Sequence, residues 1–358
     1  MVSATVVESA GIASPGASAI VVTEASRASD WESYVSSHTD ATAYHQWRWR
    51  NVFEDAFRRD CIYLVARDRE RVVGVLPLVE FSSRVFGTFA VSLPFVNYGG
   101  ILGDGEPAAK ALAAHAVALA SQRGWSHVEL RHVTRRHPEW PVRRHKVAMW
   151  LPLPDHSDVL WSALDRKVRN QVRKAEKCQC VPEDGGKELL ADFYRVFARN
   201  MRDLGTPVYG QRFFDEVVRA FPDDTRVFIV RIGAEPIAAS LTISWRDRIE
   251  VPWASALRHH TDKSPNMLLY WAMLRWAVER RFKTFDFGRS TPEEGTFQFK
   301  KQWGAEPSTL AWEYLGLAGQ VPDLTPANPR YRAAISTWQR LPLRVANLLG
   351  PAIIRHIP

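Results

Sequence analysis

The order of apolar and polar residues predicts the same series of elements twice along the chain. In the first half, strands are predicted at 61–66, 72–79, 86–93 and 126–132, with an Ala- and Leu-rich helix at 107–122 before the last of them. In the second half, strands are predicted at 227–232, 237–245, 249–256 and 283–287, again with a helix, at 266–281, before the last. The two series lie roughly 160 residues apart, which favours a duplicated architecture.

The helix between the third and fourth strands of each series predicts that one strand pair in each sheet is parallel. The sheets should therefore be mixed, in an α/β (α+β) fold of two tandem domains. Two helical patterns precede the first series. One begins near Asp30 and carries Trp31 and Tyr34, and the other covers 47–57.

Two further helices, at 159–177 and 188–204, are predicted to form a helical hairpin between the halves. We therefore expect a disordered leader at 1–22, an N-terminal domain at 23–157 and a C-terminal domain at 158–318. Residues 319–358 should form a Pro-rich linker and a basic amphipathic tail.

The tail permits two interpretations. Apolar residues recur at three- and four-residue steps between 331 and 357, and no acidic residue follows Asp323. A basic amphipathic helix that contains Trp338 is typical of helices on anionic membrane surfaces. Pro342 would kink a long interfacial helix, and the alternative is a helix packed back on the N-terminal half.

Composition narrows the class of protein. The 358-residue chain has a formal net charge of +8, which favours anionic partners such as nucleic acid, coenzyme phosphates or an acidic membrane surface. Three cysteines, Cys61, Cys178 and Cys180, do not make a disulfide framework, so a reducing compartment is expected, and no metal site is predicted. With no signal-peptide pattern and no long apolar run, we expect a cytoplasmic protein.

Three stretches are candidates for a functional site. The first is the basic helix around 164–177, where Arg169 and Lys174 suit phosphates or carboxylates, although a solvated helix face explains them too. The second is the turn after Arg202, which places Tyr209 beside a predicted cleft. The third, 285–304, interleaves aromatic and cationic residues after a strand that delivers Asp286 and breaks at Gly288. Asp286 is equally explained as a structural cap on that turn.

Several enzyme classes are disfavoured by missing motifs. The sequence has no Gly-x-Ser-x-Gly elbow, no Walker loop and no evident pair of catalytic carboxylates. These absences argue against a serine hydrolase, a phosphate-loop nucleotidase and a typical glycosidase.

The three stretches resemble the FemAB family, in particular its branch associated with exosortase and PEP-CTERM systems. The matching segments are Lys-Val-Arg-Asn-Gln-Val-Arg-Lys-Ala-Glu-Lys from 167, Arg-Asp-Leu-Gly-Thr-Pro-Val-Tyr from 202, Asp-Phe-Gly-Arg-Ser-Thr from 286 and Phe-Gln-Phe-Lys-Lys-Gln-Trp-Gly from 297. The resemblance implies two N-acetyltransferase-like (GNAT, BioF2-like) halves with a cleft between or beside them.

The resemblance also implies an activity: transfer of an acyl or aminoacyl group to an amine, in cell-envelope, exopolysaccharide or surface-protein biogenesis. Acyl-CoA or aminoacyl-tRNA would be the co-substrate, with no tightly bound cofactor. The Phe299-Lys300 pair matches the family's catalytic pair, so Lys300 would stabilise the developing oxyanion. The expected catalytic residues are Lys300, Phe299, Asp286 and Tyr209, and the expected substrate-binding residues are Arg169, Asn170, Lys174, Arg202, Arg289, Ser290 and Trp303.

Two other classes of function stay open. The basic tail at 328–358 suits a non-catalytic adaptor on the membrane surface, peripheral to the inner face. Charge alone suits a nucleic-acid-binding protein, although no recognised binding motif occurs. The sequence does not determine the oligomeric state.

Overall fold

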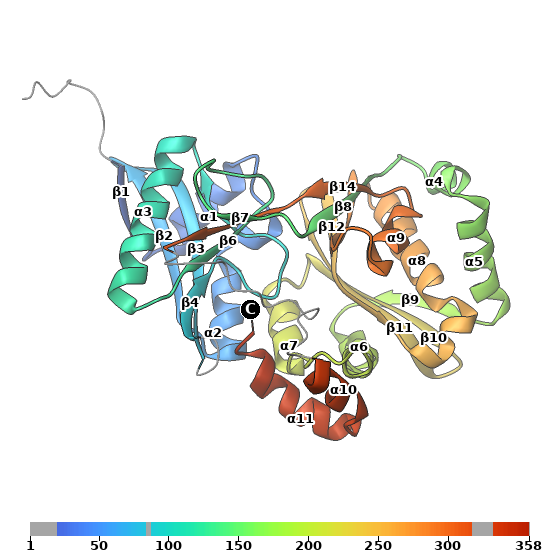
Figure 1. Ribbon diagram of the computed structural model, residues 1–358. Helices are drawn as coiled ribbons and strands as arrows, with labels where there is room; N and C mark the ends of the chain where they lie inside the picture. The colour runs from blue at the N-terminus through green and yellow to red at the C-terminus, as the bar shows by residue number, and fades with distance from the viewer. Residues whose placement is uncertain (1–19, 84–86, 317–331, 358) are drawn as a thin grey trace, which may run out of the picture.

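Two mixed β-sheets, each with helices on its faces, form the two halves of the molecule (Figure 1). The computed structural model describes residues 20–83, 87–316 and 332–357. The first half contains β1 (Ile20–Glu24), α1 (Ala28–Ser37), η1 (Ala43–His45), α2 (Arg48–Phe57), β2 (Cys61–Asp68), β3 (Arg71–Ser83), β4 (Gly87–Val91), β5 (Leu102–Gly103), α3 (Glu106–Arg123), β6 (Val128–His132) and β7 (Val142–Arg143).

The second half repeats this order after two added helices. It contains β8 (Val147–Pro152), α4 (Ser157–Ala163), α5 (Arg166–Lys177), β9 (Val181–Gly185), η2 (Lys187–Leu189), α6 (Leu190–Leu204), α7 (Gln211–Ala220), β10 (Thr225–Ile232), β11 (Glu235–Trp245), β12 (Arg248–Ala256), η3 (Arg258–Lys263), α8 (Pro265–Glu279), β13 (Thr284–Ser290) and α9 (Gly295–Lys301). The chain then continues through β14 (Glu306–Thr309), β15 (Ala311–Leu315), α10 (Arg332–Arg340) and α11 (Leu343–Ile354).

Both sheets contain the predicted parallel pair. In the first sheet, of order β1-β2-β3-β4-β6-β15-β7, β4 and β6 are parallel and are connected through α3. In the second, of order β14-β8-β13-β12-β11-β10-β9, β12 and β13 are parallel and are connected through α8. The duplicated strand–helix order predicted from the sequence is therefore confirmed.

The two halves exchange strands. β8 precedes the predicted boundary at 157, yet it pairs with β13 and β14 in the second sheet. β15 follows the whole second series, yet it pairs with β6 and β7 in the first sheet. β1 begins at Ile20, inside the range assigned to the leader, and the rest of that range lies outside the described residues.

The helices between the halves differ from the prediction. The helix expected at 159–177 divides into α4 and α5, because Leu164 has an extended backbone (φ −68°, ψ 145°) and a new helix begins after Asp165. The expected hairpin is interrupted by β9. The buried residues of α5 join one core with Phe228 of β10, whereas those of α6 join another core with Val227. Since neighbouring strand residues point to opposite faces, α5 and α6 cover opposite faces of the second sheet.

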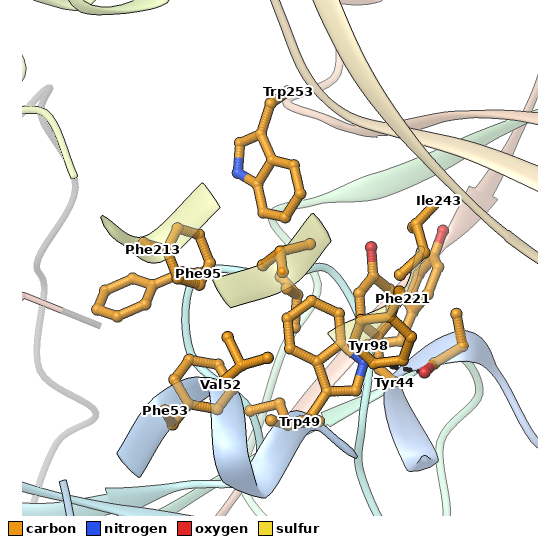
Figure 2. Close-up of a cluster of buried hydrophobic side chains, with 14 of the residues drawn as sticks. Tyr44, Trp49, Val52, Phe53, Phe95, Tyr98, Phe213, Phe221, Ile243 and Trp253 are labelled. Carbon is orange, nitrogen blue, oxygen red and sulfur yellow. Dashed lines mark hydrogen bonds between the residues drawn. The ribbon is translucent and has the colours of Figure 1, made fainter. Parts of the chain in front are cut away.

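One aromatic core joins the halves (Figure 2). Trp49 of α2 packs on Phe221, which follows α7, with ring centroids 5.0 Å apart. Phe213 of α7 lies between Phe53 of α2 (6.3 Å) and Trp253 of β12 (5.5 Å). Large buried rings contribute strongly to packing free energy, so this core holds the two halves in one arrangement.

The tail forms two helices rather than one. α10 ends at Arg340, and α11 begins after Pro342, which supplies the predicted break. Both helices contact α6, and Arg355 donates a hydrogen bond to Phe57 O of the first half at 3.1 Å. Residues 317–331, which include most of the predicted linker, lie outside the described residues. No described helix is both long enough and apolar enough to cross a membrane.

Candidate active site

The parallel strands of the second sheet separate soon after they meet. β12 and β13 pair only from Arg248↔Thr284 to Glu250↔Asp286, and both then continue without pairing to each other. A cavity of about 250 Å³ lies in the opening, lined by residues 251–254 of β12, 287–289 of β13, Lys300 of α9, Phe197 and Met201 of α6, Tyr209, Phe95 and Asn97. It therefore lies between the halves, at the carboxyl ends of parallel strands, where α/β sheets commonly bind ligands.

A backbone irregularity in β13 shapes this opening. The pairing of β13 with β8 shifts register between Asp286 and Arg289. Gly288 has a φ of +72°, and a Cβ atom there would lie 2.9 Å from Val251 O. The strand predicted to break at Gly288 thus bulges and continues to Ser290. Glycine is needed because the backbone is left-handed and the two strands approach closely.

The equivalent opening in the first sheet is filled by protein. Ser92, just after β4, donates its N–H to Glu129 O, and Gly100 donates to Arg131 O. Arg131 reaches back from β6 to Val96 O at 3.1 Å. The buried segment 92–100 thus supplies hydrogen-bond partners to the strand β6 where β4 and β6 have separated. The duplicated scaffold is therefore asymmetric, with the second-half opening available to a ligand.

Lys300 lies in the wall of the cavity and is 8% exposed. Its Nζ donates to Gly288 O at 3.1 Å and to Arg289 O at 2.8 Å. Burial lowers the pKa of Lys300 to about 8, while the charge of Asp286 acts in the opposite direction. An ammonium has three protons, so one remains for a further acceptor in the cavity.

Arg289 contributes a second cation to the same cavity. Its guanidinium lies over the Trp312 ring, 5.2 Å from the centroid, and its Nη1 is buried with no hydrogen-bond partner among the described residues. Burial and the nearby Arg131 lower the pKa of Arg289 to about 10. No salt bridge within the described parts of the chain involves Arg289 or Lys300. Cations held this way favour an anionic ligand.

Two buried carboxyl groups lie beneath the cavity. Asp286 and Glu250 are register partners on β13 and β12 and are 0% and 4% exposed. Burial raises the pKa of both, and the charge of Asp286 raises the pKa of Glu250 further. Asp286 accepts hydrogen bonds from Tyr98 (2.7 Å) and Trp150 (2.8 Å).

These carboxyl groups also support the cavity wall. Asp286 Oδ1 accepts the Gly288 N–H at 2.8 Å, the contact expected of a structural cap. Asn97 donates to Glu250 and lines the cavity. Glu250 also lines a second cavity of about 310 Å³ between the halves, together with Tyr98 and Trp150. The carboxyl pair thus lies close to the wall between two hollows.

Tyr209 lines the 250 Å³ cavity, as a residue after the rigid turn was predicted to do. Its ring packs on Phe95 with centroids 5.0 Å apart, and burial raises the pKa of its hydroxyl. Phe95 has a φ of +67°, an unusual conformation for a bulky residue and one often found at functional sites.

The remaining residues of the late motif lie close to the cavity without lining it. Phe299 packs edge-on against Tyr270 of α8 at 4.9 Å. Trp303 is buried in the core of the second half, and its indole N–H has no partner among the described residues. Ser290 is buried, and its hydroxyl is likewise unpartnered in the described part of the chain.

The other predicted binding residues are not brought to the cavity. Arg202 pairs with Asp203 and donates to Leu341 O at 3.2 Å, so it fixes the tail to α6. Arg169, Asn170 and Lys174 lie on α5, whose buried residues face α8. Their cationic face is directed away from that core.

Sequence reasoning missed Glu250, Asn97, Tyr98 and Trp150. One signal was present for Glu250, because a lone acidic residue interrupts the apolar run Ile249-Glu250-Val251. The other three belong to the first half or to β8, and only the tertiary structure brings Asn97 to β12 and Tyr98 and Trp150 to β13.

One surface cluster of the described residues could hold a metal ion. Side-chain ligand atoms of Glu235, His259 and His260 lie within 4.8 Å of one another. Glu235 begins β11 and the two histidines lie on η3, and none of the three residues lines the 250 Å³ cavity.

Comparison with known proteins agrees with this architecture. The family model of the acetyltransferase (GNAT) domain matches residues 162–301. No curated protein matches the sequence at a significant level.

Among solved structures, FemX is similar with a TM-score of 0.61 and 14% identity, over 83% of this chain and 98% of FemX. A tandem GNAT protein from the clavulanic acid biosynthesis pathway is similar with a TM-score of 0.54 and 13% identity, over 85% of this chain and 99% of that protein. The C-terminal domain of a protein assigned as a lysylphosphatidylglycerol synthetase, from Agrobacterium fabrum, is similar with a TM-score of 0.55 and 9% identity, over 81% of this chain and 92% of that domain.

These similarities define the class of fold. The molecule consists of two tandem GNAT-like domains, as the sequence predicted, and residues 162–301 in its second half match the family model of the GNAT acetyltransferase domain. At these low identities the structural matches establish the fold, while the domain match supports an acyltransferase.

Proposed function

We propose that the protein transfers an acyl or aminoacyl group from an activated thioester or ester to an amine, in the cavity between β12 and β13. The amine nitrogen attacks the carbonyl carbon and forms a C–N bond. The C–S bond of acyl-CoA or the C–O bond of aminoacyl-tRNA then breaks. The amine loses a proton, and the departing thiolate or alkoxide gains one.

The observation that carries this proposal is the pair of cations in one cavity. Lys300 has one N–H that is not used by Gly288 O or Arg289 O. This N–H would donate a hydrogen bond to the carbonyl oxygen as negative charge develops there. Arg289 would bind another anionic group of a substrate. Holding both substrates beside these groups would supply much of the acceleration.

The neighbouring residues have supporting roles in the proposal. Tyr209, which lines the cavity, would position the acceptor or relay its proton. Asp286 acts as a positioning residue, because it fixes the Gly288 bulge and its charge favours the ammonium form of Lys300. Phe299, Ser290 and Trp303 would shape the packing around α9.

Donor phosphates have two candidate positions outside the cavity. α8 begins after β12, and the intervening η3 contains Arg258 and Lys263. Helix N-termini favour anions. On α5, Arg169, Asn170 and Lys174 would contact more distant phosphates. This arrangement suits the phosphates of acyl-CoA or of aminoacyl-tRNA.

Envelope, exopolysaccharide or surface-protein biogenesis is part of the proposal, and it rests on the resemblance to the exosortase-associated FemAB branch. The competing function is a non-catalytic adaptor. An adaptor would give no reason for two cations in one cavity, whereas an acyltransferase uses such groups to stabilise the developing oxyanion.

The proposal is tested by offering acyl-CoA and aminoacyl-tRNA separately, each with a mixture of amine acceptors, and measuring thiol release or tRNA deacylation. We expect one donor to be consumed in an acceptor-dependent way. Lys300→Ala should lower turnover by about 10²-fold, typical of losing one oxyanion donor. Lys301→Ala, which alters the exposed neighbouring lysine, should leave turnover unchanged. Full turnover by a normally folded Lys300→Ala protein would remove the central assignment.

A further inference from the structure

The tail helix α11 has two apolar faces. Ala346, Gly350 and Ile354 are buried against the body, and a Cβ on Gly350 would lie 3.0 Å from Val208 N and Val208 O. On another face, five apolar residues are exposed: Val345, Leu348, Leu349, Ala352 and Ile353. Their spacing of three and four residues makes them one continuous stripe along the helix.

The side chains of this outer stripe are well exposed to solvent. Leu348 is 78% exposed, and Val345, Leu349 and Ile353 are 37%, 44% and 40% exposed. Single exposed apolar residues are ordinary, but a contiguous stripe of them marks a surface that contacts something apolar. α11 lies at the lower edge of the molecule in Figure 1, beneath α6 and α7. The exposure of its stripe shows that these side chains face solvent.

The charges around the stripe are of one sign. Arg344 falls beside Leu348 on the helix circumference, and Arg340 ends α10 just before it. Residues 332–357 contain no Asp or Glu. No salt bridge among the described residues involves Arg340 or Arg344.

We propose that the outer face of α11 docks on an anionic lipid bilayer, with the apolar stripe at the acyl boundary and the flanking arginines among the headgroup phosphates. A 12-residue helix is only about 18 Å long, too short to span a bilayer, so α11 lies along the surface. The absence of acidic residues fits anionic headgroups better than a second copy of this chain, whose net charge is +8.

The structure also corrects which tail residues can take part. Trp338, part of the predicted membrane stripe, is only 9% exposed. Ile335 packs closely on Gly205, at the end of α6. A Cβ atom added to Gly205 would lie only 2.5 Å from Cγ2 of Ile335. α10 therefore anchors the tail to α6, which lines the cavity, and α11 carries the membrane contact.

The test is co-sedimentation of the full chain with phosphatidylcholine vesicles, with and without phosphatidylglycerol. No donor is added, so the result does not depend on the proposed activity. We expect binding that needs phosphatidylglycerol and weakens with added salt. The double variant Leu348→Glu, Leu349→Glu should lower the partition coefficient at least about tenfold. The variant Arg340→Gln, Arg344→Gln should lower it about tenfold as well.

Val159→Glu is the matched control, because Val159 is 57% exposed and lies on α4. It should bind vesicles like the unaltered chain, and all variants should keep their thermal unfolding temperature, since every altered side chain is exposed. Absence of vesicle binding by the unaltered chain would overturn the proposal, as would full binding by the Leu348→Glu, Leu349→Glu protein. A dimer in light scattering that this double variant dissociates would also overturn it, because the stripe would then join two copies.

Discussion

Lys300 shows how burial and one nearby charge set the behaviour of a single residue. Removal from water disfavours the ammonium, whereas the charge of Asp286 favours it. The balance places the pKa of Lys300 at about 8, close to neutrality. If the ammonium is the form that stabilises the oxyanion, its loss should be visible in the dependence of the rate on pH.

We expect turnover to fall as the pH rises through about 8, because Lys300 then loses its charge. Asp286→Asn removes the charge that favours the ammonium, so the fall should move to lower pH. Lys300→Arg keeps its charge at all accessible pH values, so the fall should disappear, at a reduced rate. Profiles of kcat against pH for the three proteins check this. Identical alkaline limbs in all three would contradict the role of Lys300.

The helix α5 shows why an element recognised from its pattern can still be misplaced. Its apolar residues Val168, Val172 and Ala175 pack as expected. The extended backbone at Leu164 and the intervening strand β9, however, put α5 on the face of the sheet opposite α6. The cations of α5 therefore reach the cavity only through a long ligand such as the proposed donor.

This placement makes a kinetic prediction for α5. The variant Arg169→Ala, Lys174→Ala should raise KM for the donor about tenfold and leave kcat unchanged, because contacts far from the reacting carbonyl contribute uniform binding. Lys187→Ala, which alters an exposed cation on η2, is the control. Steady-state kinetics with varied donor decide the matter. An unaltered KM would mean that the α5 cations form a solvated surface.

The whole molecule is held together by exchanged strands and by a shared core. β8 lies beside β13 in the second sheet, and β15 lies beside β6 in the first. The aromatic core of Figure 2 draws residues from both halves. A chain cut at the boundary between residues 157 and 158 would leave each sheet without an internal strand and would expose this core.

We therefore expect the fragments 1–157 and 158–358 each to lack cooperative thermal unfolding when produced alone, because unpaired strand edges and exposed apolar surface are unfavourable. Produced together, the fragments should assemble, since each supplies the other's missing strand. Circular dichroism and size-exclusion chromatography measure both results. Two stable monomeric fragments would contradict this dependence.

The sequence by itself determined the local features of this protein. The spacing of apolar residues set the repeated order of strands and helices, and a helix between the third and fourth strands required a parallel pair. The late motif placed Lys300 and Arg289 close together along the chain. These features follow from neighbouring residues, so they could be predicted without coordinates.

Only the tertiary structure decided which of the two similar openings stays open. Segment 92–100 fills the first opening. The second opening lies at the bulge of Gly288 and contains a cavity that is lined by Phe95 and Tyr209. The pairing of Glu250 with Asp286 and the outward stripe of α11 were decided in the same way. Each depends on register and packing between segments far apart in sequence, and the local pattern of apolar and polar residues does not specify these contacts.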